Sequence, residues 1–121
     1  MLQRAPASSY GITSVCRALG ATPRAIRYYE QCGLVTCSRD GLRRIYTSEV
    51  FQQLRLIVQS RRANLSIRQI RHLLSVGPGR RQDALMLQMV RERLERLDAE
   101  RSLLDAILSD LAAPSPTAAH S

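Results

Sequence analysis

The sequence predicts a mainly α-helical fold that contains one small β-hairpin and is followed by one long helix. Three observations favour this fold class. Apolar residues recur every three or four positions along four short segments and along one much longer segment. An Asp40-Gly41 pair, typical of tight hairpin turns, separates the second segment from the third. The 121 residues suffice for one compact domain and an appendage.

Two short helices are expected first. Apolar residues at helical spacing predict a helix over 11–19, which Gly20 ends. Thr22 is a favoured N-cap residue and Pro23 is favoured at the first helical position, so a second helix is expected over about 23–31. Two short helices joined by a tight Gly-containing turn form a helix-turn-helix candidate.

The second helix divides into two faces when its residues are placed 100° apart. Ile26 and Tyr29 are expected to point toward the first helix. The opposite face can contact phosphates and base edges together, although most charged faces of this kind are simply solvated. Its residues are Arg24, Arg27, Tyr28 and Gln31.

A hairpin is expected next, with an extended stretch over 34–38 and a returning strand over 43–46. A two-stranded ribbon of this size is not stable alone in water. We therefore expect it to lean on the helices as the wing of a winged helix, with basic side chains near its tip free to reach a phosphate backbone. These side chains are Arg39, Arg43 and Arg44.

Two further helices complete the predicted domain. Thr47 or Ser48 caps the third helix, and Asn64 suits a left-handed turn after it. Ser66 and Gln69 form a capping-box pattern that opens the fourth helix. The residues expected to be buried are Val50, Leu54, Ile57 and Val58 on the third helix and Ile67, Ile70 and Leu74 on the fourth.

One long helix is predicted over 81–112, with an apolar seam at alternating spacings of three and four and Arg101 at its single polar position. The chain offers little of its own to cover this seam. Pairing with a second copy is therefore expected, and a helix folded back on the first domain is the alternative. The seam residues are Leu87, Val90, Leu94, Leu97, Leu104, Leu108 and Leu111.

The predicted organisation has four parts: a flexible tail over 1–9, a winged helix-turn-helix domain over 10–77, a dimerisation helix over 81–112 and a disordered tail over 113–121. No apolar run is long enough to cross a bilayer, and the first residues lack the hydrophobic core of a signal peptide. We therefore expect no membrane association and a cytoplasmic protein.

Basic charge is concentrated in the first part of the chain. All eighteen basic residues are Arg, and twelve of them lie in residues 1–75 beside only Glu30, Asp40 and Glu49. From residue 76 onward, six Arg accompany seven acidic residues. This distribution is typical of a protein in which one module binds a polyanion and another module has a different function.

Three stretches carry recognisable motifs. Residues 22–30 read Thr-Pro-Arg-Ala-Ile-Arg-Tyr-Tyr-Glu and precede Gly33-Leu34; residues 40–46 read Asp-Gly-Leu-Arg-Arg-Ile-Tyr; and residues 62–70 read Arg-Ala-Asn-Leu-Ser-Ile-Arg-Gln-Ile. Over about residues 10–76 they resemble the recognition-helix, wing and linker motifs of the MerR family of bacterial transcription regulators. The wing differs by one residue inserted after Gly41, and the linker has Asn64 for Gly and Leu65 for Phe.

The resemblance implies a homodimer, joined by an antiparallel coiled coil, that binds double-stranded DNA at a pseudo-palindromic promoter site and distorts it for RNA polymerase. It implies that Tyr29 packs and that Tyr46 either packs or contacts DNA. It also implies that Arg44 serves the wing, with Arg43 as a second candidate, and the insertion leaves open which of the two contacts a phosphate. The DNA-binding residues expected from the matching positions are Thr22, Arg24, Arg27, Tyr28, Arg43, Arg44 and Tyr46.

The chain departs from metal-sensing and redox-sensing relatives because it has no Cys after Cys37. Cys16 is expected to pack on the first helix, and His72 to lie on the surface of the fourth. Cys32 and Cys37 alone do not make a closed zinc site. We therefore expect a short family member without a C-terminal sensor domain, a metal site or a cofactor.

Other classes of function remain open at this stage. A DNA-bending architectural or recombination-associated protein would carry the same basic surface, and a protein-interaction module could use the long helix to recruit a partner. An enzyme is not expected, because the sequence has no Gly-rich phosphate loop and no nucleophile–base set.

Overall fold

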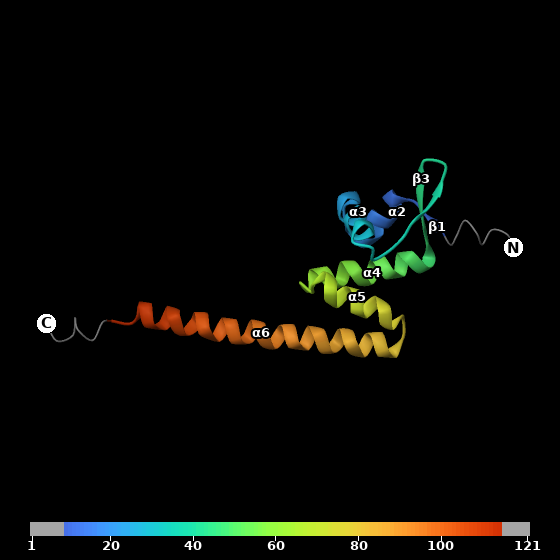
Figure 1. Ribbon diagram of the computed structural model, residues 1–121. Helices are drawn as coiled ribbons and strands as arrows, with labels where there is room; N and C mark the ends of the chain where they lie inside the picture. The colour runs from blue at the N-terminus through green and yellow to red at the C-terminus, as the bar shows by residue number, and fades with distance from the viewer. Residues whose placement is uncertain (1–8, 115–121) are drawn as a thin grey trace. The chain divides into compact units, whose positions relative to one another are not determined.

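The computed structural model describes residues 9–114 and has the predicted mainly helical fold with a small antiparallel sheet (Figure 1). The chain divides into two compact units, up to Asp83 and from Ala84, which are described separately. The elements in chain order are β1 (Ser9–Tyr10), α2 (Ile12–Leu19), α3 (Pro23–Gln31), β2 (Ser38–Asp40), β3 (Arg43–Thr47), α4 (Ser48–Arg62), α5 (Ile67–Val76) and α6 (Arg80–Ala112).

The helix-turn-helix formed by α2 and α3 is confirmed, with the ends that the sequence predicts. Gly20 ends α2 in the left-handed conformation, at φ 65°, where a residue without a Cβ is favoured. The Thr22 hydroxyl accepts a hydrogen bond from the Ala25 amide at 3.1 Å, and Pro23 is the first residue of α3. Gly33 follows the helix with a φ of 76°.

The sheet has three strands in the order β1-β3-β2, and its β2–β3 hairpin projects past α2 and α3 (Figure 1). Ser38 pairs with Ile45 and Asp40 with Arg43 across this hairpin. β1 was not predicted: Ser9, expected in the flexible tail, pairs with Thr47. Residues 1–8 of that tail lie outside the described residues.

The extended stretch expected over 34–38 belongs to β2 only at its last residue, Ser38. Leu34 and Val35 are buried instead, at 8% and 4% exposure. An apolar pair of this kind contributes more to stability inside the core than in a three-residue edge strand whose side chains are all exposed. The segment before the wing therefore anchors the hairpin to the domain.

The core lies among α2, α3, α4, α5 and β3. The prediction for α4 was right for Leu54, Ile57 and Val58, but Phe51 is buried where Val50 is only half-buried. Phe51 gains its burial from β1, because the Tyr10 ring stacks on it with 4.9 Å between centroids. The buried residues of α2, α3, β3 and the α4–α5 turn are Val15, Leu19, Ile26, Tyr29, Tyr46 and Leu65.

The buried stripe of α5 differs from the prediction. Ile70 and Leu73 are fully buried, whereas Ile67 and Leu74 are half-buried. Residues three and four apart both lie near one helix face, so Leu73 and Leu74 both border the face that Ile70 sets, and of these two Leu73 is the one that is fully buried. The helix begins where expected, since the Ser66 hydroxyl accepts from the Gln69 amide at 3.1 Å and the Gln69 side chain accepts from the Ser66 amide at 2.9 Å.

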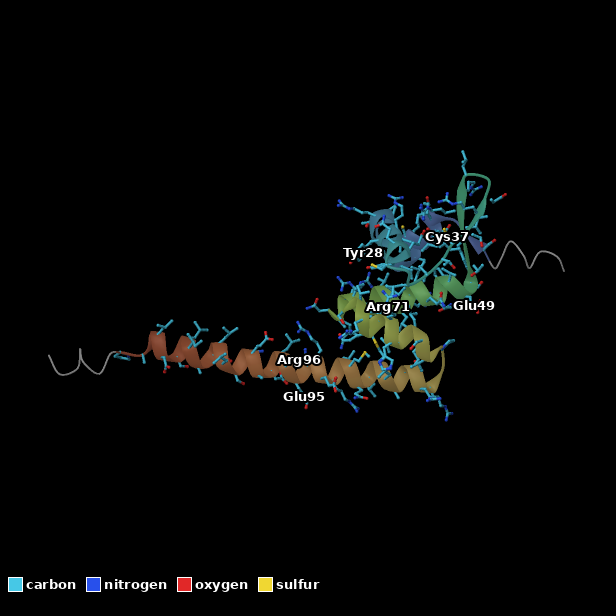
Figure 2. The ribbon with its side chains drawn as sticks, in the orientation of Figure 1. Tyr28, Cys37, Glu49, Arg71, Glu95 and Arg96 are labelled. Atoms are coloured by element: carbon cyan, nitrogen blue, oxygen red, sulfur yellow. The ribbon has the colours of Figure 1, made fainter. Side chains whose placement is uncertain are left out.

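Arginines of α4 and α5 hold the ends of the first two helices. Arg62 donates to the Leu19 carbonyl at 3.0 Å, and Arg71 (labelled in Figure 2) donates to the Cys32 carbonyl at 3.0 Å. Both carbonyls belong to helix C-termini, where a cation is favourable. These two bonds fix α2 and α3 on the rest of the domain.

The second unit consists of the helical residues from Ala84 onward, with Ala113 still donating to the Ser109 carbonyl at 3.0 Å. Residues 115–121 of the tail expected over 113–121 lie outside the described residues. Within 9–114, no helix is both long enough and apolar enough to cross a membrane.

Candidate nucleic-acid interface

The outward face of α3 is exposed as predicted. Ile26 is fully buried and Tyr29 nearly so, whereas Tyr28, labelled in Figure 2, is 47% exposed. Planar guanidinium forks and a phenol side by side suit phosphate oxygens and base edges. The exposed residues of this face are Arg24, Arg27, Tyr28 and Gln31.

Thr22 stands at the start of this face, but its hydroxyl is engaged as the N-cap of α3. The residue is exposed, so its methyl group and the free lone pair of the hydroxyl remain accessible. Its expected DNA contact therefore has to coexist with the capping bond.

A hollow of about 420 Å³ lies between the start of α2 and the wing. Gly11, the N-cap residue of α2, forms no side-chain cap, so the first amides of this helix are not occupied by a capping side chain. Wing residues that include two arginines complete the lining. The lining residues are Gly11, Ile12, Thr13, Ser14, Leu42, Arg43 and Arg44.

The wing tip is fully accessible. Leu42, the residue at the turn, is 95% exposed, and Arg39 and Arg43 are exposed beside it. Gly41 adopts a φ of 65°, which a residue without a Cβ adopts at little cost in this tight turn. The wing thus presents the basic side chains that the sequence predicts, with one exception.

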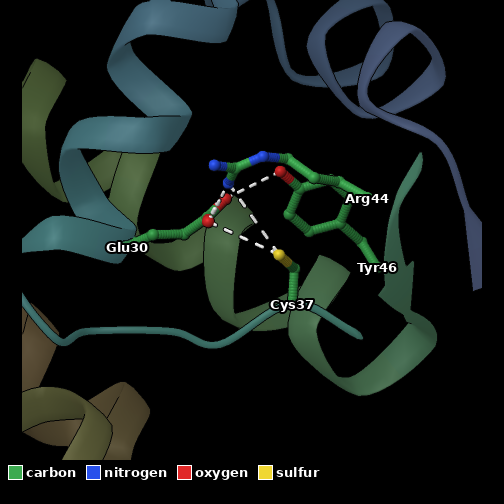
Figure 3. A network of polar contacts seen from close by, with 4 residues as sticks. All are labelled: Glu30, Cys37, Arg44 and Tyr46. Carbon is green, nitrogen blue, oxygen red and sulfur yellow. Dashed lines mark hydrogen bonds and ion pairs between the residues drawn. The ribbon is translucent and has the colours of Figure 1, made fainter. Parts of the chain in front are cut away.

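That exception is Arg44, which turns toward α3 and forms an ion pair with Glu30 (Figure 3). The Glu30 carboxylate also accepts a hydrogen bond from the Tyr46 hydroxyl at 2.7 Å and from the Cys37 thiol at 3.4 Å. The side chain of Glu30 is only 14% exposed. One carboxylate therefore receives three donors, from β3 and from the segment before the wing.

Tyr46 has no exposed surface. Of the two roles left open for it, packing is the one the structure has, and a direct DNA contact by its side chain is incompatible with this conformation. Burial, together with the bond to Glu30, raises the pKa of Tyr46 to about 12. The phenol therefore keeps its proton and donates it in a hydrogen bond to the Glu30 carboxylate.

Arg44 also departs from the expected exposed wing arginine, because its guanidinium is engaged with Glu30 and lies 3.9 Å from the Cys37 sulfur. Burial first, and then the bond to Glu30, raise the pKa of the Cys37 thiol. Thiolates are the reactive form of cysteine, so this environment lowers the reactivity of Cys37.

Glu30 was not among the site residues predicted from the sequence, although it ends the recognition motif. A signal was present: Glu30 is one of three acids among the first 75 residues, and it lies on a helix rich in arginine. Asp40 and Glu49 are exposed, so scarcity alone does not mark an internal ion pair. What distinguishes Glu30 is its place directly after the buried Tyr29 on the recognition helix.

Within residues 9–114, no group of three or more His, Cys, Asp or Glu side chains is arranged to hold a metal ion. Cys16, Cys32 and Cys37 are half-buried free thiols. His72 is exposed on α5.

Comparisons with known proteins agree with this geometry. Residues 10–76 match the family "MerR HTH family regulatory protein", and residues 51–113 match "MerR, DNA binding". The chain is 33% identical over 84 residues to the HTH-type transcriptional regulator ZntR homolog of Haemophilus influenzae, an alignment that covers 68% of this chain. It covers 62% of that relative, so the chain spans less than two thirds of the relative's length.

Solved structures share the fold. A transcriptional regulator of the MerR family from Bacillus cereus is 23% identical with a TM-score of 0.66, over 85% of this chain and 77% of that one. HiNmlR, a MerR family regulator lacking the sensor domain and bound to promoter DNA, is 18% identical with a TM-score of 0.56, over 84% and 79%. The motifs, the fold and the family matches together show that this chain belongs to the MerR family of helix-turn-helix transcription regulators.

Proposed function

We propose that this protein binds a pseudo-palindromic promoter site as a homodimer, distorts the DNA between the half-sites and thereby regulates transcription. The observation that carries the proposal is the exposed basic face of α3 in one compact unit with a basic wing. A fold neighbour, HiNmlR, is bound to promoter DNA in its own structure, which supports the same use of the fold.

The α3 face supports specificity as well as affinity. Arg24 and Arg27 are exposed one helical turn apart, and a guanidinium can donate two parallel hydrogen bonds to a guanine edge. Arg43 on the wing is suited to the phosphate backbone, which positions a protein without reading sequence. Each phosphate contact would make binding weaken as salt rises.

The α6 seam supports the homodimer. Six of the seven predicted seam residues are exposed in the single chain, and Val90 is half-buried. Burying a fully exposed leucine side chain stabilises a protein by about 1.5–3 kcal/mol. Pairing with a second α6 would bury the exposed part of each seam leucine and so would stabilise the dimer. The exposed seam residues are Leu87, Leu94, Leu97, Leu104, Leu108 and Leu111.

A dimer of this kind grips two half-sites at a fixed distance. The DNA between them then bends or twists to fit, so its sequence affects affinity without being contacted. RNA polymerase at the same promoter is the partner we propose to respond to this distortion, which places the protein in the cytoplasm at the nucleoid.

Footprinting on the promoter of its own or an adjacent gene tests the proposal. We expect one protected inverted repeat, which Arg27→Ala abolishes. The control is Arg96→Ala, which removes an equal charge from an exposed position of α6 outside the seam. Protection that ignores sequence, or that survives Arg27→Ala, contradicts the proposal.

Transcription in vitro from the bound promoter separates regulation from DNA bending alone. A regulator changes the rate of initiation when its site is filled. An architectural or recombination-associated protein would fill the site and leave initiation unchanged.

A further inference from the structure

The wing has few contacts of its own to fix its orientation. Strand β2 contributes three residues, all exposed, and β1 pairs with β3 through only two. Such short ribbons are not stable in isolation. The side chains that join the wing to the helices therefore decide where its tip lies.

Glu30 is the acid at this junction. It lies on the last turn of α3, whose outward face carries Arg27 and Tyr28, and it binds donors 7, 14 and 16 residues away in the chain (Figure 3). The other acids in the part of this unit that the structure describes, up to α5, are Asp40 at the wing tip and Glu49 at the start of α4. Glu30 is thus the charge that links the helix to the wing.

The two wing arginines are not equivalent. Neighbouring residues of a strand point to opposite faces, and Arg44 faces Glu30. Arg43 is exposed, and its guanidinium lies 3.9 Å from the position that a Cβ on Gly11 would take, beside the hollow at the start of α2. An Arg44 guanidinium already paired with a shielded carboxylate would lose that partner by moving to a phosphate.

We propose that Glu30 is a positioning residue that holds the wing against the recognition helix through Arg44 and Tyr46, and that Arg43 is the wing arginine that contacts phosphate. This inference rests on the proposed function for its DNA contact. The inference selects Arg43 over Arg44 as the wing residue that contacts phosphate, a choice that the insertion after Gly41 leaves open. It also implies that the wing is held at a fixed distance from α3 before the protein binds DNA.

A double-mutant cycle tests the positioning role. Glu30→Gln keeps the side-chain size, whereas Arg44→Gln shortens the side chain but keeps an amide donor. Each removes one charge, and the double variant restores the net charge. We expect each single variant to weaken binding to the footprinted duplex about tenfold, and the double variant to weaken it by about the same factor rather than about a hundredfold. Circular dichroism at the assay temperature checks that all variants are folded.

Salt dependence separates positioning from direct contact. The slope of log K against log salt falls by about 0.9 for each phosphate contact that is lost. We expect Arg43→Gln to lower this slope by that amount per protomer, and Arg44→Gln to leave it unchanged. If Arg44→Gln lowers the slope as Arg43→Gln does, and its effect adds to that of Glu30→Gln, the inference is overturned.

Cys37 reports on the wing without any DNA. Removal of Arg44 takes a positive charge from beside the thiol, which by electrostatics alone would slow its reaction with a thiol reagent. A released wing would expose the thiol and speed the reaction. We therefore expect Arg44→Gln to accelerate Cys37 labelling several-fold, with Cys16 on α2 unchanged; slower labelling of Cys37 contradicts the inference.

The two proposals fail in different ways. A wild-type protein that does not prefer its footprinted duplex over a random one overturns the proposed function, while Cys37 labelling and the salt slopes on random duplex still test the positioning role. A specific wild-type protein with additive variants and slow Cys37 labelling overturns the positioning role alone.

Discussion

Arginine side chains have two roles at the scale of single residues. Some are exposed where DNA can reach them, as Arg27 is, and others donate hydrogen bonds within the domain. Composition cannot separate the two groups, because the internal bonds join residues up to 43 positions apart. The internally bonded arginines are Arg44, Arg61, Arg62 and Arg71.

The Tyr46 hydroxyl is expected to stabilise the fold through its bond to Glu30. Tyr46→Phe removes a buried hydrogen bond to a charged acceptor and should lower the free energy of unfolding by about 2 kcal/mol at neutral pH, measured by urea denaturation. Tyr10→Phe, which keeps the ring stacked on Phe51, is the control and should change little.

This contribution should also depend on pH. The pKa of Tyr46 is raised from 10.0 to about 12, so folding favours the protonated phenol. The stabilisation is complete below pH 10 and is lost as the pH rises toward 12. The difference in unfolding free energy between wild type and Tyr46→Phe should shrink over that range; a constant difference would show that the phenol does not titrate in this way.

At the scale of elements, local signals predicted helix ends well. Thr22, Asn64 and Ser66 act through the backbone within three residues of themselves, so their roles are visible in the sequence. Strand β1 has only two residues and no period of its own, and it exists because β3 lies beside it. The exposed face of α3 was predictable for the same local reason, whereas the partners of Glu30 depend on how the chain folds back.

Thr22 is expected to stabilise the start of α3 through its hydroxyl, and the contribution of the hydroxyl can be separated from that of the methyl group. Thr22→Ala removes the cap of α3 and should lower the free energy of unfolding by about 1 kcal/mol, whereas Thr22→Ser keeps a capping hydroxyl and should cost little. Thermal unfolding of both variants measures this. Equal losses in the two would mean that the methyl group, rather than the hydroxyl, stabilises this end of α3.

At the scale of the whole molecule, the seam of α6 is expected to set the oligomeric state. Leu97→Asp places a charge in the middle of the seam and should convert a dimer into monomers in sedimentation experiments, since an unpaired buried charge costs several kcal/mol. Leu103 is equally apolar and 62% exposed but lies off the seam, so Leu103→Asp should leave the dimer intact. A monomeric wild-type protein would contradict the proposal that a homodimer binds two half-sites.

The most direct test of the whole account measures binding to two duplexes that differ only in spacing. One carries the inverted repeat found by footprinting, and the other has five base pairs inserted between its half-sites, which turns one half-site to about the opposite face of the helix. A dimer held by α6 should bind the second duplex about a hundredfold more weakly, close to the affinity for a single half-site. Equal affinity for both duplexes would contradict the account, because it would mean that the two DNA-binding units are not held at a fixed distance.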